Sequence, residues 1–316
     1  MLTLFHHPFC PHSRFVRLAL EELSLPLRLV EERVWERREE FLRLNPAATT
    51  PVLVEEGAPP IPGAGVIAEY LDETHAAESV PPVRLLPLEI ADRVEVRRLM
   101  SWFNDKMFAE ASGPLVMERV YKRYMRAEQG GGPPDTGSMR AARSNIKYHL
   151  GYIGWLVRRR DWLAGDRLTY ADLSAAAHLS AIDYLGDVPW NEDETAKAWY
   201  ARIKSRPSFR TLLGETLAGL APAPSYANLD FCRRLRPRAR LPTWRARTAS
   251  TRSALRGRTR LPAPFRGCAR SLRPAVMATW IGWRAKPIAA ATRARCGRTR
   301  ARLSCSASIT APMMIR

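Results

Sequence analysis

Short apolar runs alternate with stretches of helically spaced apolar residues between Leu2 and His75. The runs predict strands, and the helical stretches predict helices. In chain order, the expected elements are a strand at 2–6, a helix ending near Leu23, a strand at 26–34, a helix at 35–44, strands at 51–54 and 59–62, and a helix at 66–75. Because prolines flank the last strand, it is expected to be a short edge strand. This order predicts a compact mixed α/β unit.

From Glu89 onward, apolar residues recur at helical spacing and no stretch has convincing strand character. The expected helices cover residues 89–126 with a break at Gly113-Pro114, residues 138–159, a segment opening at Thr169, and residues 196–213 with a break at Arg206-Pro207. The expected core includes Val94 and four tryptophans, Trp102, Trp155, Trp162 and Trp199. This half of the chain is therefore predicted to be all-helical.

Thr169 and Asp172 form the clearest helix start in the chain. The Thr169 hydroxyl can cap the amide of Asp172, and the Asp172 carboxylate can reach back to the amide of Thr169. A helix is therefore expected to begin directly after Thr169.

Charge is distributed unevenly along the chain. The 316 residues carry a formal net charge of +19, but the segment 231–316 contains 21 Arg, one Lys and no acidic residue. The segment 1–230 is mildly acidic, with 28 basic and 31 acidic side chains and a net charge of −3. An argument from overall charge to nucleic acid or acidic lipid therefore concerns only the end of the chain.

The Arg-rich segment, residues 232–316, is also rich in Ala, Pro, Thr and Ser, whose codons are GC-rich. Translation of a GC-rich gene in the wrong reading frame predicts such a composition. The alternatives are a basic arm that binds phosphates or anionic lipid, and an inert extension. Nucleic acid is the less favoured partner, because Phe265, Trp280 and Trp283 show no regular interleaving with the arginines. In each case we expect a disordered segment without a packed fold.

Cysteine and histidine positions limit the metal and membrane chemistry. Four cysteines, Cys232, Cys268, Cys296 and Cys305, lie in the Arg-rich segment with spacings that match no zinc pattern, and all six histidines precede them. No metal is therefore expected.

The segment 1–230 lacks an uncharged run long enough to span a membrane, and the N-terminus lacks the basic start of a signal peptide. We expect a cytoplasmic protein without membrane contact.

Cys10 is the one cysteine in the segment 1–230, and it lies where the first strand turns into the first helix. The unpaired N–H groups of a helix start favour a thiolate, which makes Cys10 a candidate reactive thiol. Thr50-Pro51 precedes a strand, where a cis proline would let the Thr50 backbone face the same turn and pair with an extended peptide ligand. Buried packing of Cys10 and a trans peptide bond are the plain alternatives.

Together these positions resemble the cytosolic glutathione transferases over about residues 2–213. The motifs that carry the resemblance are Cys10–Arg14, Asn45-Pro46, Thr50–Leu53, Ile67–Leu71, Leu163–Asp172 and Arg206–Phe209. The resemblance implies a thioredoxin-like domain that holds glutathione, a helical domain that lines a pocket for a small electrophile, and a homodimer. Cys10 would activate the glutathione thiol or form a mixed disulfide with it. Thr50 would pair with the glutathione backbone, with Pro51 and Ser13 at the same site.

The fold class implied is the glutathione transferase fold, an α/β thioredoxin-like N-terminal domain followed by an all-α C-terminal domain. The domains are expected at residues 1–76 and 89–218, joined by a linker at 77–88. An extended peptide at 219–231 is expected to follow the helical domain.

Gly63 and Ala64 depart from the family pattern. The family has an acidic residue followed by Ser at these positions, where the pair grips the γ-glutamyl end of glutathione. Neither residue here has a side chain able to make those bonds. Losing two charge-assisted contacts costs about 3 kcal/mol or more, which is at least about a hundredfold in affinity.

This departure, together with Tyr184–Trp190 and Tyr226–Phe231, resembles a subgroup of the family that binds the tubulin-like division protein FtsZ. That resemblance implies a non-catalytic regulator of cell division whose chain ends near Phe231. The partner-binding residues would be Tyr226, Leu229, Asp230 and Phe231. The alternative is that this peptide only covers the helical bundle. Two functions therefore stay open: a glutathione-dependent transferase or thiol reductase, and an FtsZ-binding regulator.

Overall fold

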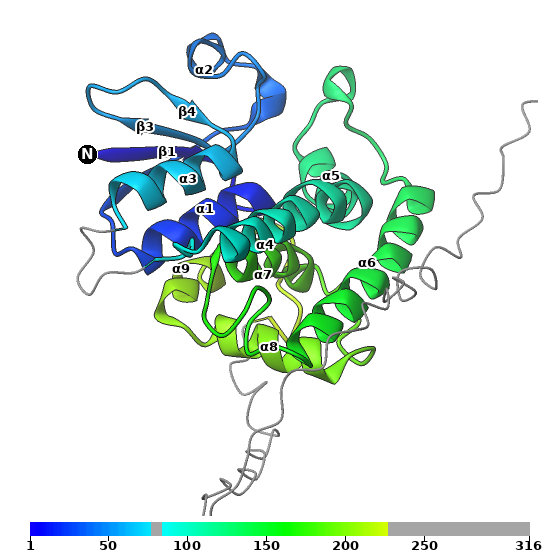
Figure 1. Ribbon diagram of the computed structural model, residues 1–316. Coiled ribbons are helices and arrows are strands. Elements are labelled where there is room, and N and C mark those ends of the chain that lie inside the picture. Colours follow the sequence, from blue (N-terminus) through cyan, green and yellow to red (C-terminus); the bar gives the residue numbers. More distant parts are fainter. Residues whose placement is uncertain (77–83, 227–316) are drawn as a thin grey trace, which may run out of the picture. The chain divides into compact units, whose positions relative to one another are not determined.

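The structure, a computed structural model, describes residues 1–76 and 84–226, which belong to one compact unit (Figure 1). Residues 77–83 of the expected linker lie outside the described residues. The same holds for Leu229, Asp230 and Phe231 of the C-terminal peptide, and for the whole Arg-rich segment.

The N-terminal half is a four-stranded mixed sheet combined with helices (Figure 1). The strand order is β2-β1-β3-β4, with β1 parallel to β2 and antiparallel to β3. The elements are β1 (Leu2–His6), α1 (Pro11–Glu22), β2 (Leu27–Glu31), η1 (Val34–Glu36), α2 (Glu39–Leu44), β3 (Val52–Glu55), β4 (Ile61–Pro62) and α3 (Ala64–Thr74). The mixed α/β unit predicted from the sequence is confirmed.

Two expected boundaries between β2 and α2 differ from the structure. The strand ends at Glu31 instead of Val34, and the helix begins at Glu39 instead of Trp35. Arg37 has a φ of +48°, in the left-handed region, and it closes the short 3-10 turn η1 before α2 begins. A helix cannot continue through that conformation, so the turn and the helix are separate elements.

The C-terminal half is built from helices (Figure 1). They are α4 (Ile90–Ser101), the π-helical η2 (Trp102–Ser112), α5 (Gly113–Arg119), η3 (Tyr121–Arg123), η4 (Ala127–Gln129), α6 (Thr136–Val157), α7 (Tyr170–Tyr184), α8 (Glu194–Lys204), η5 (Pro207–Phe209) and α9 (Arg210–Leu213). The expected break at Gly113 is where α5 begins. A Cβ at Gly113 would lie 2.7 Å from the Phe108 carbonyl oxygen, so this junction requires glycine.

Helix α7 is buried along its whole length and packs along α1, which joins the two halves. The predicted capping box is present at its start, where Asp172 accepts hydrogen bonds from the Thr169 amide and hydroxyl, each at 3.0 Å. The other carboxylate oxygen of Asp172 accepts from the Leu163 amide at 2.9 Å and from Trp199 Nε1 at 3.0 Å. Asp172 therefore connects the start of α7 to Trp199 in α8 and to the loop that precedes α7.

Some residues expected in the core lie at the surface. Val94 is 58% exposed and Trp155 is 40% exposed, whereas Trp199 is buried. Trp155 lies on the outer face of α6, where the Arg159 guanidinium covers its ring at 4.3 Å. Apolar spacing along a helix shows which residues share a face but not whether another element covers that face. In residues 1–76 and 84–226, no helix is both long and apolar enough to cross a membrane.

Candidate functional site

Cys10 occupies the N-cap position of α1, directly before Pro11. The residue is extended there (φ −70°, ψ 117°) and only 6% exposed. Its thiol donates to the Thr50 carbonyl oxygen at 3.6 Å, and the Thr50-Pro51 peptide bond is cis. The structure thus places Cys10, Thr50 and Pro51 together, as the sequence motifs suggested.

The environment of Cys10 favours a thiolate. Burial alone would raise the pKa of the thiol, but a hydrogen bond and positive charge from His12 oppose it. The hydroxyl and backbone amide of Ser13 act in the same direction, and the pKa of Cys10 falls to about 7. Cys10 therefore ionises closer to neutral pH than an ordinary cysteine does.

His12 lies in the first turn of α1 and is held by the C-terminal half. Its Nε2 donates to the backbone carbonyl of Asn104 in η2 at 2.8 Å. Its ring packs against Phe108 and meets His178 edge-on, with centroid distances of 4.4 and 5.3 Å. Burial would lower the pKa of His12, but its hydrogen bond to Cys10 and the thiolate charge raise it. The deprotonated form of Cys10 and the protonated form of His12 therefore stabilise each other.

Tyr121, in η3, is a member of the site that sequence reasoning missed. It lines the same cavity as Cys10 and interacts with the Cys10 side chain. Burial raises the pKa of Tyr121 well above its ordinary value, and the charge on Cys10 adds to this. The phenol therefore stays protonated and can donate to the thiolate. Tyr121 lies in the other half of the chain and belongs to no motif, so no local signal identified it.

Cys10 opens onto a cavity of about 330 Å³ between the two halves of the chain. The cavity is lined by Cys10, His12, Val34, Ala48, Thr49, Thr50, Pro51, Gly63, Ala64, Phe108 and Tyr121. Gly63 and Ala64 form part of its wall at the start of α3, as the family resemblance implied. Among these lining residues, none is acidic, and His12 is the only basic one.

Ser13, expected to contact glutathione, does not line this cavity. It is fully buried, and its hydroxyl accepts from the His7 amide at 3.4 Å while also interacting with Cys10. The hydroxyl supports the Cys10 turn from behind. Its geometry fits the role of a turn residue better than that of a ligand contact.

Tyr226, expected to bind a partner, is fully buried. Its hydroxyl donates to the Leu212 carbonyl at 2.8 Å and accepts from the Arg14 guanidinium at 3.1 Å. Its ring meets Tyr184 edge-on at 5.1 Å. Because the ring fills a space between α1, α7 and α9, it is not available to a partner in this arrangement. Tyr226 instead fixes the C-terminal segment to the body.

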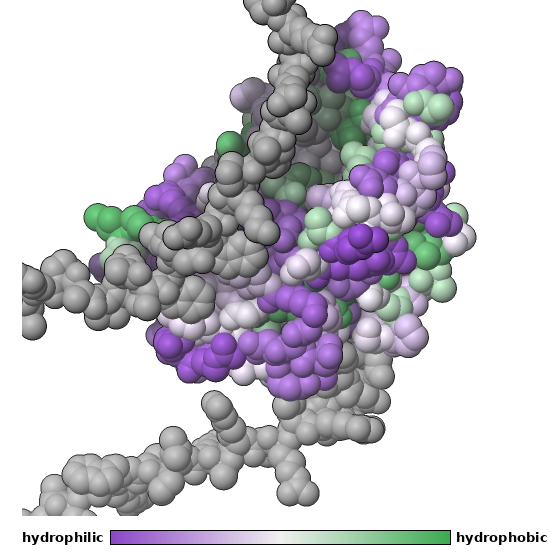
Figure 2. Space-filling view, turned by 90° about the vertical axis from the view of Figure 1, so that its right-hand side faces the viewer, coloured by the Kyte–Doolittle hydropathy of each residue, from purple (hydrophilic) through white to green (hydrophobic). Residues whose placement is uncertain are grey.

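A groove of about 280 Å³ adjoins the cavity and shares Phe108 and Tyr121 with it. The other lining residues are Ala109, Gly113, Pro114, Val116 and Met117, and all are apolar. In the view of Figure 2, hydrophobic residues gather in the recessed upper part, while much of the protruding surface is hydrophilic. The groove gives an apolar contact next to the thiol site.

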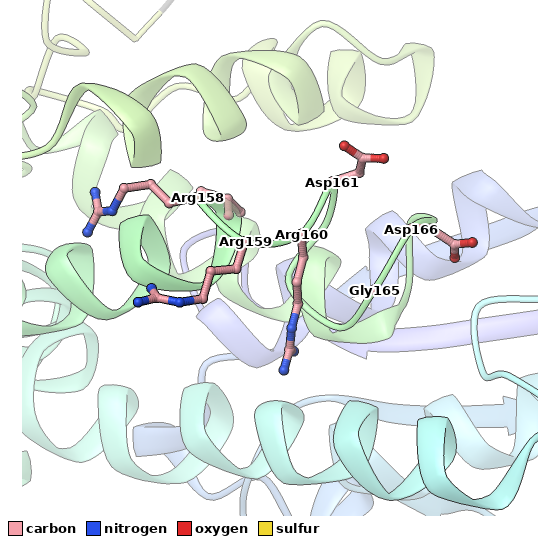
Figure 3. Close-up of a pocket in the computed structure, with 7 residues that line it drawn as sticks. Arg158, Arg159, Arg160, Asp161, Gly165 and Asp166 are labelled. Carbon is pink, nitrogen blue, oxygen red and sulfur yellow. The ribbon is translucent and has the colours of Figure 1, made fainter. Parts of the chain in front are cut away.

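A third hollow, of about 440 Å³, lies at the end of α6 and includes three consecutive arginines (Figure 3). In this view, the side chains of Arg158 and Arg159 extend to the same side, whereas that of Arg160 points in another direction. Arg158 pairs with Asp193 at 2.9 Å, and Arg160 pairs with Glu95 at 2.7 Å. These charges are already engaged, so the hollow lacks the converging groups that an anion site needs. Among the described residues, no group of His, Cys, Asp and Glu could hold a metal ion.

Comparisons with known proteins agree with the geometry. The family model for the glutathione S-transferase N-terminal domain matches residues 4–79, and that for the C-terminal domain matches residues 135–214. FtsZ-localized protein A of Caulobacter vibrioides is 47% identical over 232 residues, which cover 72% of this chain and 98% of that protein.

Solved structures show the same relationship. A glutathione S-transferase from Sinorhizobium meliloti superimposes with a TM-score of 0.71 at 50% identity, covering 73% of this chain and 99% of the other. FzlA from C. crescentus superimposes with a TM-score of 0.66 at 45% identity, covering 72% and 99%.

Proposed function

This chain belongs to the glutathione S-transferase family, and from that premise we propose that it acts as a partner of the division protein FtsZ. The observation that carries the proposal is the similarity to FtsZ-localized protein A, which extends over 98% of that protein. A likeness of that extent covers nearly the whole length of the relative and more of this chain than the two family-model domains do.

The cavity wall supports this proposal. Where other family members grip the γ-glutamyl end of glutathione, this chain has Gly63 and Ala64. Gly63 has a φ of +94°, which favours glycine and disfavours an acidic residue with a side chain. Binding of glutathione is therefore weakened, and a function that depends on a protein partner becomes the stronger candidate.

The anchoring of the C-terminal segment also supports it. Tyr226 is held by Arg14 and Leu212, and the Ser225 carbonyl accepts from Lys204 at 2.9 Å. The proposed contacts to FtsZ, Leu229, Asp230 and Phe231, follow shortly after this anchor in the chain. Tyr226 is thus fixed three positions before Leu229 in the sequence, and a peptide with apolar anchors suits a groove on a partner.

Co-sedimentation with FtsZ filaments tests the proposal. The full chain and a chain ending at Phe231 should pellet with the filaments, and Asp230→Lys or Phe231→Ala should reduce the pelleted fraction at least fivefold. Asp166→Lys makes the same charge change as Asp230→Lys, but at an exposed position in the loop after α6, and is the matched control. If neither chain pellets above the filament-free background, the proposal is wrong.

Thiol chemistry at Cys10 is a second candidate, favoured by the thiolate-stabilising contacts of His12 and Tyr121. The substrate would be a thiol, a disulfide or a small electrophile that needs no γ-glutamyl contact, with glutathione a weak co-substrate. The adjoining apolar groove would take the hydrophobic part of such an electrophile.

Isothermal titration of glutathione separates the two candidates. Binding at micromolar concentration would show that another contact replaces the γ-glutamyl grip and would make Cys10 a working catalytic residue. We expect no binding below about the millimolar range, given the loss of two charge-assisted contacts. Cys10→Ser is the control for covalent capture, because it removes the thiol and keeps the cavity.

We also propose a cytoplasmic homodimer. Exposed apolar side chains on α3 and α4, and just before α4, include Val66, Leu88, Ile90 and Val94, which are 58–79% exposed. Such a strip is typical of a surface that a second copy covers. Light scattering coupled to size-exclusion chromatography should give twice the mass of one chain. The double variant Ile90→Glu with Val94→Glu should give the mass of a single chain.

A further inference from the structure

We propose that Asn104 is a positioning residue that holds His12 against Cys10 and so maintains the reactive form of the thiol. This inference rests on the proposed thiol function of Cys10. Asn104 belongs to η2 in the C-terminal half and does not line the cavity. Its role would be to fix the partner of the nucleophile.

The first step is the assignment of the two His12 ring nitrogens. The Asn104 backbone carbonyl can only accept, so Nε2 of His12 carries the proton in their 2.8 Å hydrogen bond. Nδ1 is then the ring nitrogen left to take up a proton, and His12 lines the same cavity as Cys10, with which it interacts electrostatically. A neutral His12 can thus take the thiol proton at Nδ1, and the resulting imidazolium keeps both contacts.

The second step is that the Asn104 side chain is itself fixed. Its Oδ1 accepts from Ser174 Oγ at 2.8 Å and from His178 Nε2 at 3.2 Å, both on α7. His178 in turn is held through Nδ1 by Ser112 Oγ at 2.7 Å. Ser112, Ser174 and His178 are fully buried. Two bonds therefore tie residue 104 of η2 to α7, and with it the carbonyl that orients His12.

The third step is that the proton stays on His12. Burial lowers the pKa of His178 well below its ordinary value, and the charge of His12 lowers it further. His178 therefore remains neutral. Asp105 adds to the groups that raise the pKa of His12. The other groups facing the thiol are the Ser13 and Tyr121 hydroxyls and the Thr50 carbonyl, which remain uncharged. His12 is thus the cation that stabilises the thiolate.

Alkylation of Cys10 in the full-length protein tests this arrangement. Trypsin releases residues 1–14, which contain Cys10 and no other cysteine, so mass spectrometry can follow iodoacetamide labelling at this residue alone. We expect Asn104→Ala to move the midpoint of the pH–rate profile up by about one pH unit and to slow labelling at pH 7 by about two- to threefold. The thiolate fraction falls about fivefold, and the greater nucleophilicity of a more basic thiolate offsets part of this.

Two further variants make the result specific. Ser174→Ala removes one of the two donors to Asn104 and should shift the midpoint in the same direction by a smaller amount. Asn145→Ala is the matched control, because its amide donates to the Glu110 carbonyl of the same helix η2 at 3.0 Å but touches neither His12 nor Cys10. It should leave the profile unchanged. If Asn104→Ala does not fold, Ser174→Ala carries the test.

His12→Ala distinguishes failure of this inference from failure of the thiol function. If His12→Ala shifts the profile but Asn104→Ala and Ser174→Ala do not, His12 is held by other contacts and the inference is wrong. If His12→Ala leaves the profile unchanged, the thiolate does not depend on His12, and the proposed chemistry at Cys10 fails as well.

Discussion

Replacement of Tyr226 by Phe removes one oxygen from the point where the C-terminal segment meets the first helix. In the wild-type structure, the hydroxyl donates to the Leu212 carbonyl at 2.8 Å and accepts from Arg14 at 3.1 Å. Arg14 is fully buried and keeps its bonds to the Pro8 carbonyl at 2.7 Å and to Ser180 at 3.0 Å. The variant therefore leaves a carbonyl and one guanidinium donor with fewer partners in the core.

The expected loss of unfolding free energy follows from these contacts. A buried hydrogen bond contributes about 1 kcal/mol net, and leaving a buried partner unsatisfied costs roughly 1–3 kcal/mol. The phenyl ring still fills the space, so no cavity forms. We expect Tyr226→Phe to lower the free energy of unfolding by about 2 kcal/mol. For a folded part of this size, that corresponds to a fall in Tm of about 4–8 °C.

Guanidinium denaturation followed by tryptophan fluorescence measures this change. Tyr148→Phe is the control, because Tyr148 is 52% exposed on α6, and it should alter stability by less than about 0.5 kcal/mol. If Tyr226→Phe also changes stability by less than about 0.5 kcal/mol, Tyr226 does not anchor the segment. The support that this anchor gives to the FtsZ proposal would then be lost.

Three other predictions concern separate parts of the molecule. Asp172→Ala should lower the free energy of unfolding by about 3–5 kcal/mol, because it removes a buried carboxylate that accepts four hydrogen bonds. A denaturant titration measures this change, and a loss below about 1 kcal/mol would contradict the prediction. Glu22→Ala should lower the free energy of unfolding by about 2 kcal/mol in the same assay, because Glu22 joins α1 to Arg206 through two hydrogen bonds of 2.6 Å and also binds Ser208. Glu39→Ala removes an exposed ion pair and is the control. A change no larger than that of the control would refute the prediction. The rate of Cys10 alkylation should rise about tenfold per pH unit below pH 7 and level off above it, since its pKa is lowered to about 7; a midpoint near 9 would show that the thiolate is not stabilised.

Local patterns predicted much of the fold. Strand and helix order follow from runs of apolar residues, and the start of α7 follows from Thr169 and Asp172, because a capping box involves residues only three positions apart. The predictions of buried residues were wrong where burial depends on whether another element packs against the apolar face of a helix. Trp155 has helical spacing with its neighbours but faces outward. The turn at Arg37 was missed because its left-handed conformation has no glycine to mark it.

By itself, the sequence determined the family, the position of Cys10 at a helix start, the presence of Gly63 and Ala64 before the third helix, and the change of composition after Phe231. These features depend on residue identity and on short spacings. Only the tertiary structure decided that the Asn104 carbonyl contacts His12, that Tyr121 lines the same cavity as Cys10, and that Tyr226 is buried. The physical reason is that such contacts join segments far apart in the sequence, and packing of whole helices, rather than spacing along the chain, brings them together.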